Sequence, residues 1–254
     1  MKKGILIVAH PDDEILFFSS VIKKVEKIIV CFGPTRNKIV NEGRKQLVES
    51  NTFKNFIFLQ IKESSSVEPD HWEFPRRTHF GMNVKKNEKE YRDNFDKIVG
   101  RLDDYITHNE NIYTHNPWGE YGHEEHVQVF RAVEEIAEKK KCNIFVSGYV
   151  SDLSLNLAKL EVKNISNKPI FYDTPLELTK EYSEIYKQFN CWTWNNKYEW
   201  PKFEIFYEYK FQDEEKLNYI TSLPPLLMLS WSRKPKKNHF IGRVLRRFNF
   251  LNFF

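Results

Sequence analysis

The chain has 254 residues, of which 41% are hydrophobic and 15% aromatic, so it can bury a sizeable core and extensive disorder is excluded. The 39 Lys and Arg residues against 35 Asp and Glu residues leave a formal charge of +4, too small an excess to indicate nucleic acid as a partner. No apolar stretch reaches the roughly 18 residues of a membrane span, and the apolar run near the N-terminus is too short for a signal peptide, so we expect a cytoplasmic protein.

The three cysteines, Cys31, Cys142 and Cys191, are isolated from one another in the sequence. Without a C-x-x-C pair, they indicate neither a disulfide framework nor a thiolate zinc site. We therefore expect them to be reduced thiols buried in the core.

Short apolar runs alternate with helical patterns over the first part of the chain. This alternation predicts an α/β fold, with a Rossmann-like, mostly parallel sheet that carries helices on both faces. The expected strands are residues 5–8, 27–32, 55–61, 111–114 and 143–146, and the expected helices are residues 14–24, 38–50, 88–109 and 124–140.

The first expected strand ends in the sequence AHPDDE, which spans Ala9–Glu14. His10 and Asp13 are three positions apart, so a helix that begins at Asp13 lets both point into the crevice at the carboxyl edge of the sheet. An imidazole and a carboxylate suit a borderline divalent ion such as zinc. Two ligands do not hold a catalytic metal, so a further ligand is expected elsewhere.

The segment Ser64–Phe95 has no clear periodicity. Long irregular segments of compact domains are usually functional or mobile. Its residues Trp72, Arg76, Arg77 and His79 could stack on a substrate ring and bind a phosphate or diphosphate group. An ordinary surface loop with a solvated basic pair is an equally good interpretation.

A second histidine cluster, YGHEEH, follows the strand expected at residues 111–114. His123 and His126 stand at the start of a helical pattern with i, i+3 spacing, so they can share one helix face. Because parallel strands end at the same edge of a sheet, we expect both clusters to converge on one ion. Taken alone, the second cluster would also fit a solvated helix N-terminus, at which Glu124 and Glu125 are favoured by the helix dipole.

The pattern is less regular beyond residue 150. Residues 179–189 predict a helix, and the aromatic-rich stretch that begins with CWTWNN at Cys191 predicts strands or the wall of a pocket. No Gly-, Ser- or Pro-rich linker is present, so we expect one domain over residues 1–232 and a basic, Phe-rich segment over residues 233–254. Within that segment, Phe240–Phe254 predicts either a helix that packs on the domain or a partner, or a peripheral contact with an anionic membrane surface.

AHPDDE together with YGHEEH at Tyr121–His126 resembles the zinc-dependent deacetylases of the LmbE/PIG-L group. That family removes acetyl or related acyl groups from amino sugars such as N-acetylglucosamine. The first hexapeptide matches the family pattern completely. The second motif usually reads GHPDH, so here Glu124 replaces Pro and Glu125 replaces Asp. The resemblance covers about residues 1–150.

Carried over position by position, the resemblance implies that His10, Asp13 and His126 bind one zinc ion, although other divalent metals would also fit. Three protein ligands leave a fourth position for water. Zinc lowers the pKa of such a water to about 7, so a neighbouring carboxylate can take its proton. The resemblance gives that role of general base to Asp12.

The resemblance also implies roles for four residues around the ion. His123 would stabilise the oxyanion or protonate the leaving amine, and Tyr121 would assist the tetrahedral intermediate. Glu14 and Glu125 would orient the ligands, as carboxylates beside metal-bound imidazoles commonly do.

The implied reaction is hydrolysis of the N-acetyl amide of an amino sugar, in a GlcNAc-type glycoside, a nucleotide sugar or a lipid-linked sugar, in glycan or glycoconjugate biosynthesis. Two alternatives remain open: a metal-dependent phosphoesterase, which would more often hold two metals, and a non-catalytic sugar-binding assembly subunit. A dinucleotide enzyme is disfavoured because G-x-G-x-x-G is absent, and a serine hydrolase because G-x-S-x-G is absent. The sequence predicts no oligomeric state.

Overall fold

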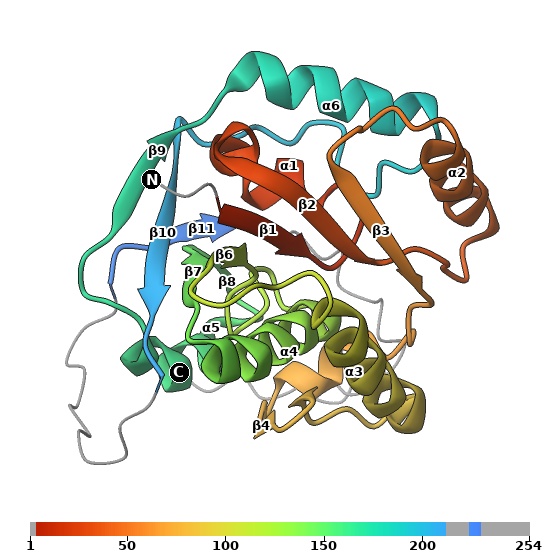
Figure 1. The fold of residues 1–254 in the computed structure, drawn as a ribbon. Coiled ribbons are helices and arrows are strands. Elements are labelled where there is room, and N and C mark those ends of the chain that lie inside the picture. Colours follow the sequence, from red (N-terminus) through yellow and green to blue (C-terminus); the bar gives the residue numbers. More distant parts are fainter. Residues whose placement is uncertain (1–3, 212–223, 230–254) are drawn as a thin grey trace, which may run out of the picture.

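The centre of the molecule is a seven-stranded sheet, seen in a computed structural model that describes residues 4–211 and 224–229 (Figure 1). The strand order is β3-β2-β1-β6-β7-β10-β9. The first five strands run parallel, whereas β10 is antiparallel to both of its neighbours. The predicted mostly parallel sheet is therefore confirmed. The strands are β1 (Gly4–Val8), β2 (Val25–Phe32), β3 (Phe56–Ile61), β6 (Asn111–Thr114), β7 (Asn143–Ser147), β9 (Ile170–Asp173) and β10 (Phe203–Tyr209).

Two short strand pairs lie outside the main sheet. They are the parallel pair of β8 (Tyr149–Ser151) and β11 (Leu227–Leu229) and the antiparallel pair of β4 (Arg77–Thr78) and β5 (Gly81–Met82).

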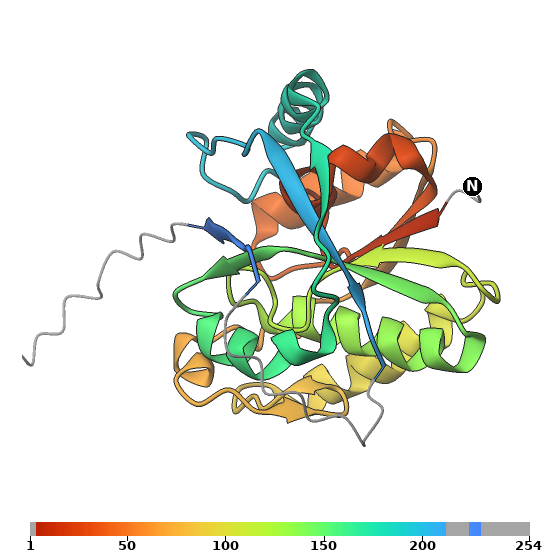
Figure 2. The same cartoon turned by 90° about the vertical axis from the view of Figure 1, so that its left-hand side faces the viewer.

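Helices cover both faces of the main sheet, as predicted (Figures 1 and 2). One face carries α1, α2 and α6, and the other carries α3, α4 and α5. Their bounds are α1 (Asp13–Phe17), α2 (Lys38–Glu49), α3 (Glu88–Leu102), α4 (Glu124–Lys140), α5 (Leu155–Glu161) and α6 (Leu176–Gln188). Among the described residues, no helix has the length and apolar character needed to cross a membrane.

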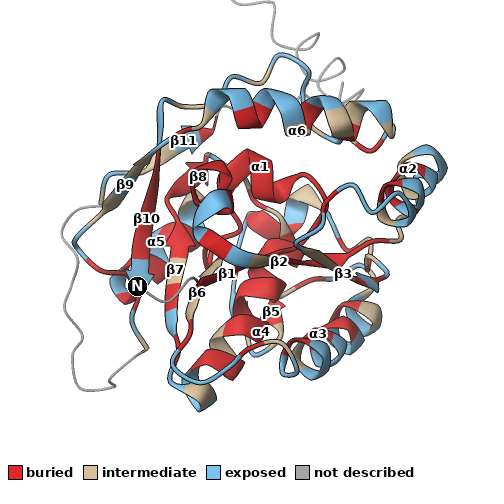
Figure 3. Cartoon of the chain, turned by 45° about the horizontal axis from the view of Figure 1, so that its top comes forward, coloured by how far each residue is buried: buried red, intermediate tan, exposed pale blue. Residues whose placement is uncertain are grey.

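β1 shows why the central strands are continuously apolar. Its residues Ile5 and Ile7 pack into the core cluster that contains α3 and α4, whereas Leu6 and Val8 pack into the cluster beneath α1 and α6. A strand that is covered on both faces has no solvent side, so its sequence does not alternate. Figure 3 shows this burial at the centre of the sheet and the exposed outer side of α6.

Two predicted helices are shorter than expected. The helix predicted over residues 14–24 breaks at Phe18, where α1 gives way to a 3-10 turn at Ser19–Lys24. The break is stabilised because the backbone N–H groups and hydroxyls of Ser19 and Ser20 all donate to the buried carboxylate of Glu204. The helix predicted to reach residue 109 ends at Leu102.

All three cysteines are buried and free, as expected. The basic segment at residues 233–254, with the membrane or partner contact predicted for Phe240–Phe254, lies outside the described residues.

The sheet topology creates a crevice between two neighbouring strands. β1 and β6 are neighbours in the sheet. After β1 the chain crosses to β2 on one side of this pair, and after β6 it crosses to β7 on the other side. In open α/β sheets, ligands bind at the carboxyl ends of the strands at such a switch point. Both histidine clusters of the sequence follow these two strands.

Candidate metal centre

The loop after β1 folds back sharply and brings His10 against Asp13. Asp12, between them, adopts a left-handed backbone conformation with φ of 92°, which only a few per cent of non-glycine residues adopt. The backbone N–H of His10 donates to Asp13 Oδ2 at 2.7 Å, and His10 Nδ1 lies 3.2 Å from the same oxygen. The turn therefore assembles an imidazole and a carboxylate at the edge of the sheet.

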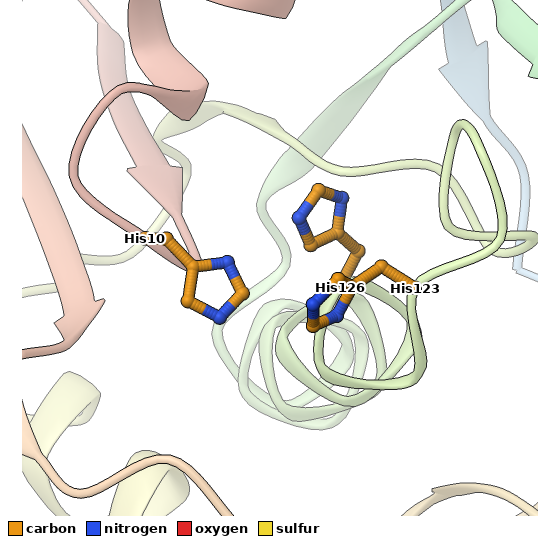
Figure 4. A group of neighbouring side chains, drawn as sticks. All are labelled: His10, His123 and His126. Carbon is orange, nitrogen blue, oxygen red and sulfur yellow. The ribbon is translucent and has the colours of Figure 1, made fainter. Parts of the chain in front are cut away.

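A glycine turn positions the second cluster. Gly119 and Gly122 have φ of 66° and 91°, and a Cβ atom added to Gly119 would lie 2.6 Å from the carbonyl oxygen of His123. α4 begins directly after this turn, with His123 at its N-cap. Figure 4 shows His123 and His126 at the start of α4, with His10 facing them from the loop after β1.

The His126 ring is fixed from one side and open on the other. Its Nδ1 atom lies 2.8 Å from Glu120 Oε2, and a carboxylate can only accept, so Nδ1 is the donor. The Nε2 atom is buried, has no hydrogen-bond partner among the described residues and lies 3.3 Å from Asp13 Oδ2. A lone pair of His126 therefore faces a carboxylate oxygen.

The His10 ring has a carboxylate on both sides. Its Nε2 atom lies 2.9 Å from Glu125 Oε2, which leaves Nδ1 facing Asp13. Burial alone would lower the pKa of His10, but its hydrogen bonds to Asp13 and Glu125 raise that pKa to about 10. The site thus favours positive charge at this position.

The donor set fits a divalent metal ion. His10 Nδ1 and His126 Nε2 both approach Asp13 Oδ2, and these acceptor atoms repel one another unless a proton or a cation lies between them. Zinc ligands at about 2.0–2.1 Å in tetrahedral geometry are about 3.3 Å apart. The observed separations of 3.2 and 3.3 Å match that spacing.

Three groups of potential ligands occur within the described part of the chain, each with its ligand atoms within 4.8 Å of one another. They are His10 with His123 and His126, Asp13 with His115 and His126, and His10 with Glu63 and Glu125. His10 and His126 each belong to two of these groups, and the predicted set of His10, Asp13 and His126 is not itself one of the three.

His115 is not available as a ligand, although it directly follows β6. Its Nε2 atom accepts the backbone N–H of Ala9 at 2.8 Å, and its Nδ1 atom lies 3.0 Å from Glu120 Oε2. Both ring nitrogens are therefore already in use.

Glu120 is a functional residue that the sequence analysis missed. It is fully buried with φ of 45°, and histidines lower its pKa against the opposing effect of burial, to about 2. The signal available in the sequence was an acid flanked by histidines in THNPWGEYGHEEH. Its carboxylate accepts four hydrogen bonds, from the Asn116 backbone, the Ser147 hydroxyl, His115 and His126.

Asp12 is held by a residue from the far end of the domain. The backbone N–H and the hydroxyl of Thr193 donate to Asp12 Oδ2 at 2.9 and 2.7 Å. Burial and the neighbouring Asp13 carboxylate raise the pKa of Asp12 to about 7. A carboxyl group with that pKa can exchange a proton near neutrality.

His123 and Tyr121 stand beside the predicted ligands. His123 Nδ1 accepts the backbone N–H of Glu125 at 3.2 Å, so the proton of the neutral ring is on Nε2. Burial and the neighbouring His10 hold the pKa of His123 well below its usual value. Burial raises the pKa of Tyr121 well above its usual value, so its phenol stays protonated.

The structure gives the two predicted supporting acids different surroundings. Glu14 accepts a hydrogen bond from the Tyr186 hydroxyl at 2.6 Å and one from the Asp12 backbone at 3.2 Å, and burial raises its pKa to about 8. Glu125 bonds to His10 and accepts from the backbone and hydroxyl of Ser64. Glu14 thus supports the turn at Asp12, whereas Glu125 fixes the His10 ring.

A cavity of about 480 Å³, which we call the metal cavity, opens over these residues. Arg44 and Glu63, which form a partly buried ion pair, line it beside His10. Trp192 and Trp194 form part of its wall, which is one of the two outcomes expected for the CWTWNN stretch.

The four predicted substrate-binding residues of the loop after β3 do not line the metal cavity. Trp72 is 2% exposed and donates through Nε1 to Glu124, so its ring has no free face for a substrate, and its predicted stacking role is corrected to a core role. Arg77 pairs with Glu134 and lines a different cavity together with His79, while Arg76 is exposed.

Glu124 has a structural role at the position at which the second motif departs from its usual form. Its Oε1 atom accepts from the Glu68 backbone and from Trp72 Nε1, both at 3.1 Å, and His71 Nδ1 lies 3.4 Å away. These contacts fasten the loop after β3 to the start of α4, next to His123.

A family model described as PIG-L, GlcNAc-PI de-N-acetylase, matches residues 5–137, which is just over half of the chain. The fold is similar to that of a deacetylase solved in complex with teicoplanin, with a TM-score of 0.50, 10% identity, and coverage of 83% of this chain and 99% of that one. It is also similar to a zinc-inhibited form of teicoplanin deacetylase, with a TM-score of 0.51, 12% identity and the same coverage. No curated protein matches the chain.

Proposed function

The chain belongs to the PIG-L family of de-N-acetylases, and from that premise we propose that it hydrolyses the N-acetyl amide of an amino sugar with the help of one zinc ion. The observation that carries the proposal is the convergence of His10 Nδ1 and His126 Nε2 on Asp13 Oδ2. These three side chains would hold the ion. A deacetylase of similar fold has been solved in a zinc-inhibited form, so the choice of zinc for this chain is based on its own set of two imidazoles and one carboxylate.

When bound, zinc lowers the pKa of a coordinated water to about 7 and polarises a carbonyl oxygen. Asp12 then serves as general base, because its pKa of about 7 and its place in the wall of the metal cavity suit proton transfer from water. The two hydrogen bonds from Thr193 fix the direction of its carboxylate.

We assign His123 to the oxyanion rather than to the leaving amine. Its lowered pKa keeps the ring neutral, and its Nε2–H is free of the intrahelical bond that Nδ1 makes. A neutral N–H aimed at the developing negative charge stabilises the transition state. The proton that Asp12 takes from water passes to the amine nitrogen as the C–N bond breaks. Tyr121, protonated and in the wall of the metal cavity, is the second donor.

The metal cavity suits a hydroxyl-rich ligand. Its volume of about 480 Å³ lies in the range of small-molecule sites. Arg44, Glu63, Thr35 and Asn37 supply donors and acceptors around it, and Trp192 and Trp194 supply apolar surface. This mixture supports a sugar as the bound group.

The test is release of acetate from N-acetylated amino sugars by metal-depleted and zinc-loaded protein. We expect no release after chelation and restored release with zinc. The variant Asp12→Asn should bind zinc normally but react about 10²–10⁴-fold more slowly. Acetate release by chelated protein would contradict the metal role. Phosphate release from phosphoesters without acetate release would favour the phosphoesterase alternative, and a zinc-loaded protein that binds sugars without turnover would favour the assembly subunit.

A further inference from the structure

A second cavity of about 520 Å³, which we call the aromatic cavity, adjoins the metal cavity. Thr193 and Trp194 line both cavities. Thr193 also holds Asp12, so the shared wall lies next to the proposed general base. A ligand that is positioned for reaction in the metal cavity therefore lies next to the aromatic cavity.

A row of aromatic rings connects the two cavities. Tyr121, in the metal cavity, packs against Trp194 with ring centroids 4.8 Å apart, and Trp194 packs against Tyr198 at 5.8 Å. Tyr198 and the buried Tyr149 belong to the aromatic cavity. The Tyr149 hydroxyl is buried beside Tyr198 without a hydrogen bond of normal geometry to the described residues. The rings of Tyr121, Trp194 and Tyr198 meet edge to face, at interplanar angles of 70° and 85°, so aromatic side chains extend from one cavity to the other.

The polar groups of the aromatic cavity indicate an uncharged ligand. Asn195, Lys197 and Glu199 are exposed on its walls, and the one positive and one negative charge cancel. A diphosphate would find no net positive charge there. An alkyl chain would place these three polar side chains against hydrocarbon, which is unfavourable for groups that lose water without gaining hydrogen bonds.

We propose that the aromatic cavity binds the neutral sugar ring next to the amino sugar, so that the substrate is an oligosaccharide or a sugar glycoside. The ring stacks on the aromatic faces, and its hydroxyls bond to the polar side chains. This inference rests on the proposed deacetylation and narrows its substrate class, because it excludes nucleotide sugars and alkyl-linked sugars as the best substrates.

The first experiment compares kcat/KM for acetate release from four N-acetylglucosamine compounds: the methyl glycoside, the β1,4-linked disaccharide, the octyl glycoside and the uridine diphosphate sugar. We expect the disaccharide to exceed the other three by about tenfold or more, the factor that about 1.4 kcal/mol of extra transition-state binding produces. Equal values for the methyl glycoside and the disaccharide would overturn the inference. So would a preference for the octyl glycoside or for the nucleotide sugar.

The second experiment fills the aromatic cavity with Met228→Trp. Met228 lines that cavity, is 59% exposed and does not line the metal cavity. The matched control is Leu160→Trp, at a residue that is 57% exposed and lines neither cavity. We expect Met228→Trp to remove the advantage of the disaccharide while the methyl glycoside reacts at its usual rate, and Leu160→Trp to change neither. A disaccharide advantage that survives Met228→Trp would overturn the inference.

A binding measurement separates this inference from the proposed function. Metal-depleted protein is titrated with the disaccharide and the methyl glycoside, and binding is followed by tryptophan fluorescence. We expect the disaccharide to bind more tightly to wild type and to lose this advantage in Met228→Trp only. If that result accompanies zinc-loaded protein that releases no acetate from any compound, deacetylation fails and the sugar site stands. Acetate release without preferential disaccharide binding would support deacetylation and overturn the sugar site.

Discussion

The carboxyl ends of β1 and β6 build opposite halves of one site in different ways. After β1, a six-residue motif delivers His10 and Asp13 directly from a single tight turn. After β6, the first histidine, His115, is consumed by hydrogen bonds, and the proposed ligand His126 comes from the first turn of α4. Distance from the strand end therefore does not decide which of these two histidines is the proposed ligand. They differ in their ring nitrogens: Nε2 of His126 has no hydrogen-bond partner among the described residues, whereas both nitrogens of His115 are in use.

The two halves of the site are alike in the residues that hold the proposed histidine ligands. Each proposed histidine ligand is bonded through its far nitrogen to a buried carboxylate, Glu125 for His10 and Glu120 for His126. Such carboxylates fix the tautomer and orientation of a metal-binding imidazole. The two carboxylates differ in the hydrogen bonds that hold them in place. Glu120 accepts four, whereas Glu125 bonds to His10 and accepts from the backbone and hydroxyl of Ser64.

The largest expected effect is on zinc binding, and it should differ between substitutions of the two histidines that bond to Glu120. His126→Gln should abolish stoichiometric zinc binding and acetate release, because glutamine is a poor zinc ligand and Nε2 of His126 is the unpartnered atom. His115→Gln should lower the free energy of unfolding, yet retain zinc. Metal analysis and thermal unfolding of both variants test this. A zinc-free His115→Gln protein together with a zinc-replete His126→Gln protein would reverse the assignment.

The next effect compares the two supporting carboxylates. Glu120→Gln and Glu125→Gln should each weaken zinc affinity by about 10–100-fold, with Glu120→Gln nearer the upper figure because more donors lose a charged acceptor. Competition with a chromophoric chelator measures both affinities. If both variants bind zinc with the affinity of the wild-type protein, neither carboxylate orients a ligand.

The smallest effect concerns the contact that reaches Asp12 from the far end of the domain. Thr193→Val keeps the backbone donor and removes the hydroxyl donor, and both bonds lower the pKa of Asp12. The pKa of Asp12 should therefore rise. Since the base works when ionised, activity should be lost at a higher pH as the solution is acidified, with a shift of up to about one pH unit. A kcat profile of zinc-loaded protein measures the shift, and an unchanged acidic limb would exclude control of Asp12 by Thr193.

The features that the sequence predicted are local in the chain. The apolar runs of the central strands, the turn in AHPDDE and the histidine spacing at the start of α4 all depend on neighbours within a few positions. Their convergence followed from one topological rule about parallel strands. For this reason, the fold class and the proximity of His10 to His126 could be predicted from the sequence alone.

The features that were missed depend on contacts between distant segments. Arg44 and Thr193 carry no motif, and they reach the site only because α2 and the segment after α6 pack over the crevice. Trp72 looked like a substrate platform, but the unusual Glu124 supplies a buried acceptor that draws its indole into the core. A single sequence shows residue types, whereas burial decides their roles.

The hydrogen bonds from Thr193 to Asp12 join residues 181 positions apart, and this separation orders events during synthesis on the ribosome. The proposed metal ligands all belong to the first half of the chain, which emerges first. Thr193 and Trp194, which hold the base and form the shared wall of the two cavities, emerge much later. The residues that would hold the metal and the residue that orients the proposed base therefore leave the ribosome at different times. A chain cut short before Thr193 would keep the proposed ligands but lack the two hydrogen bonds to Asp12.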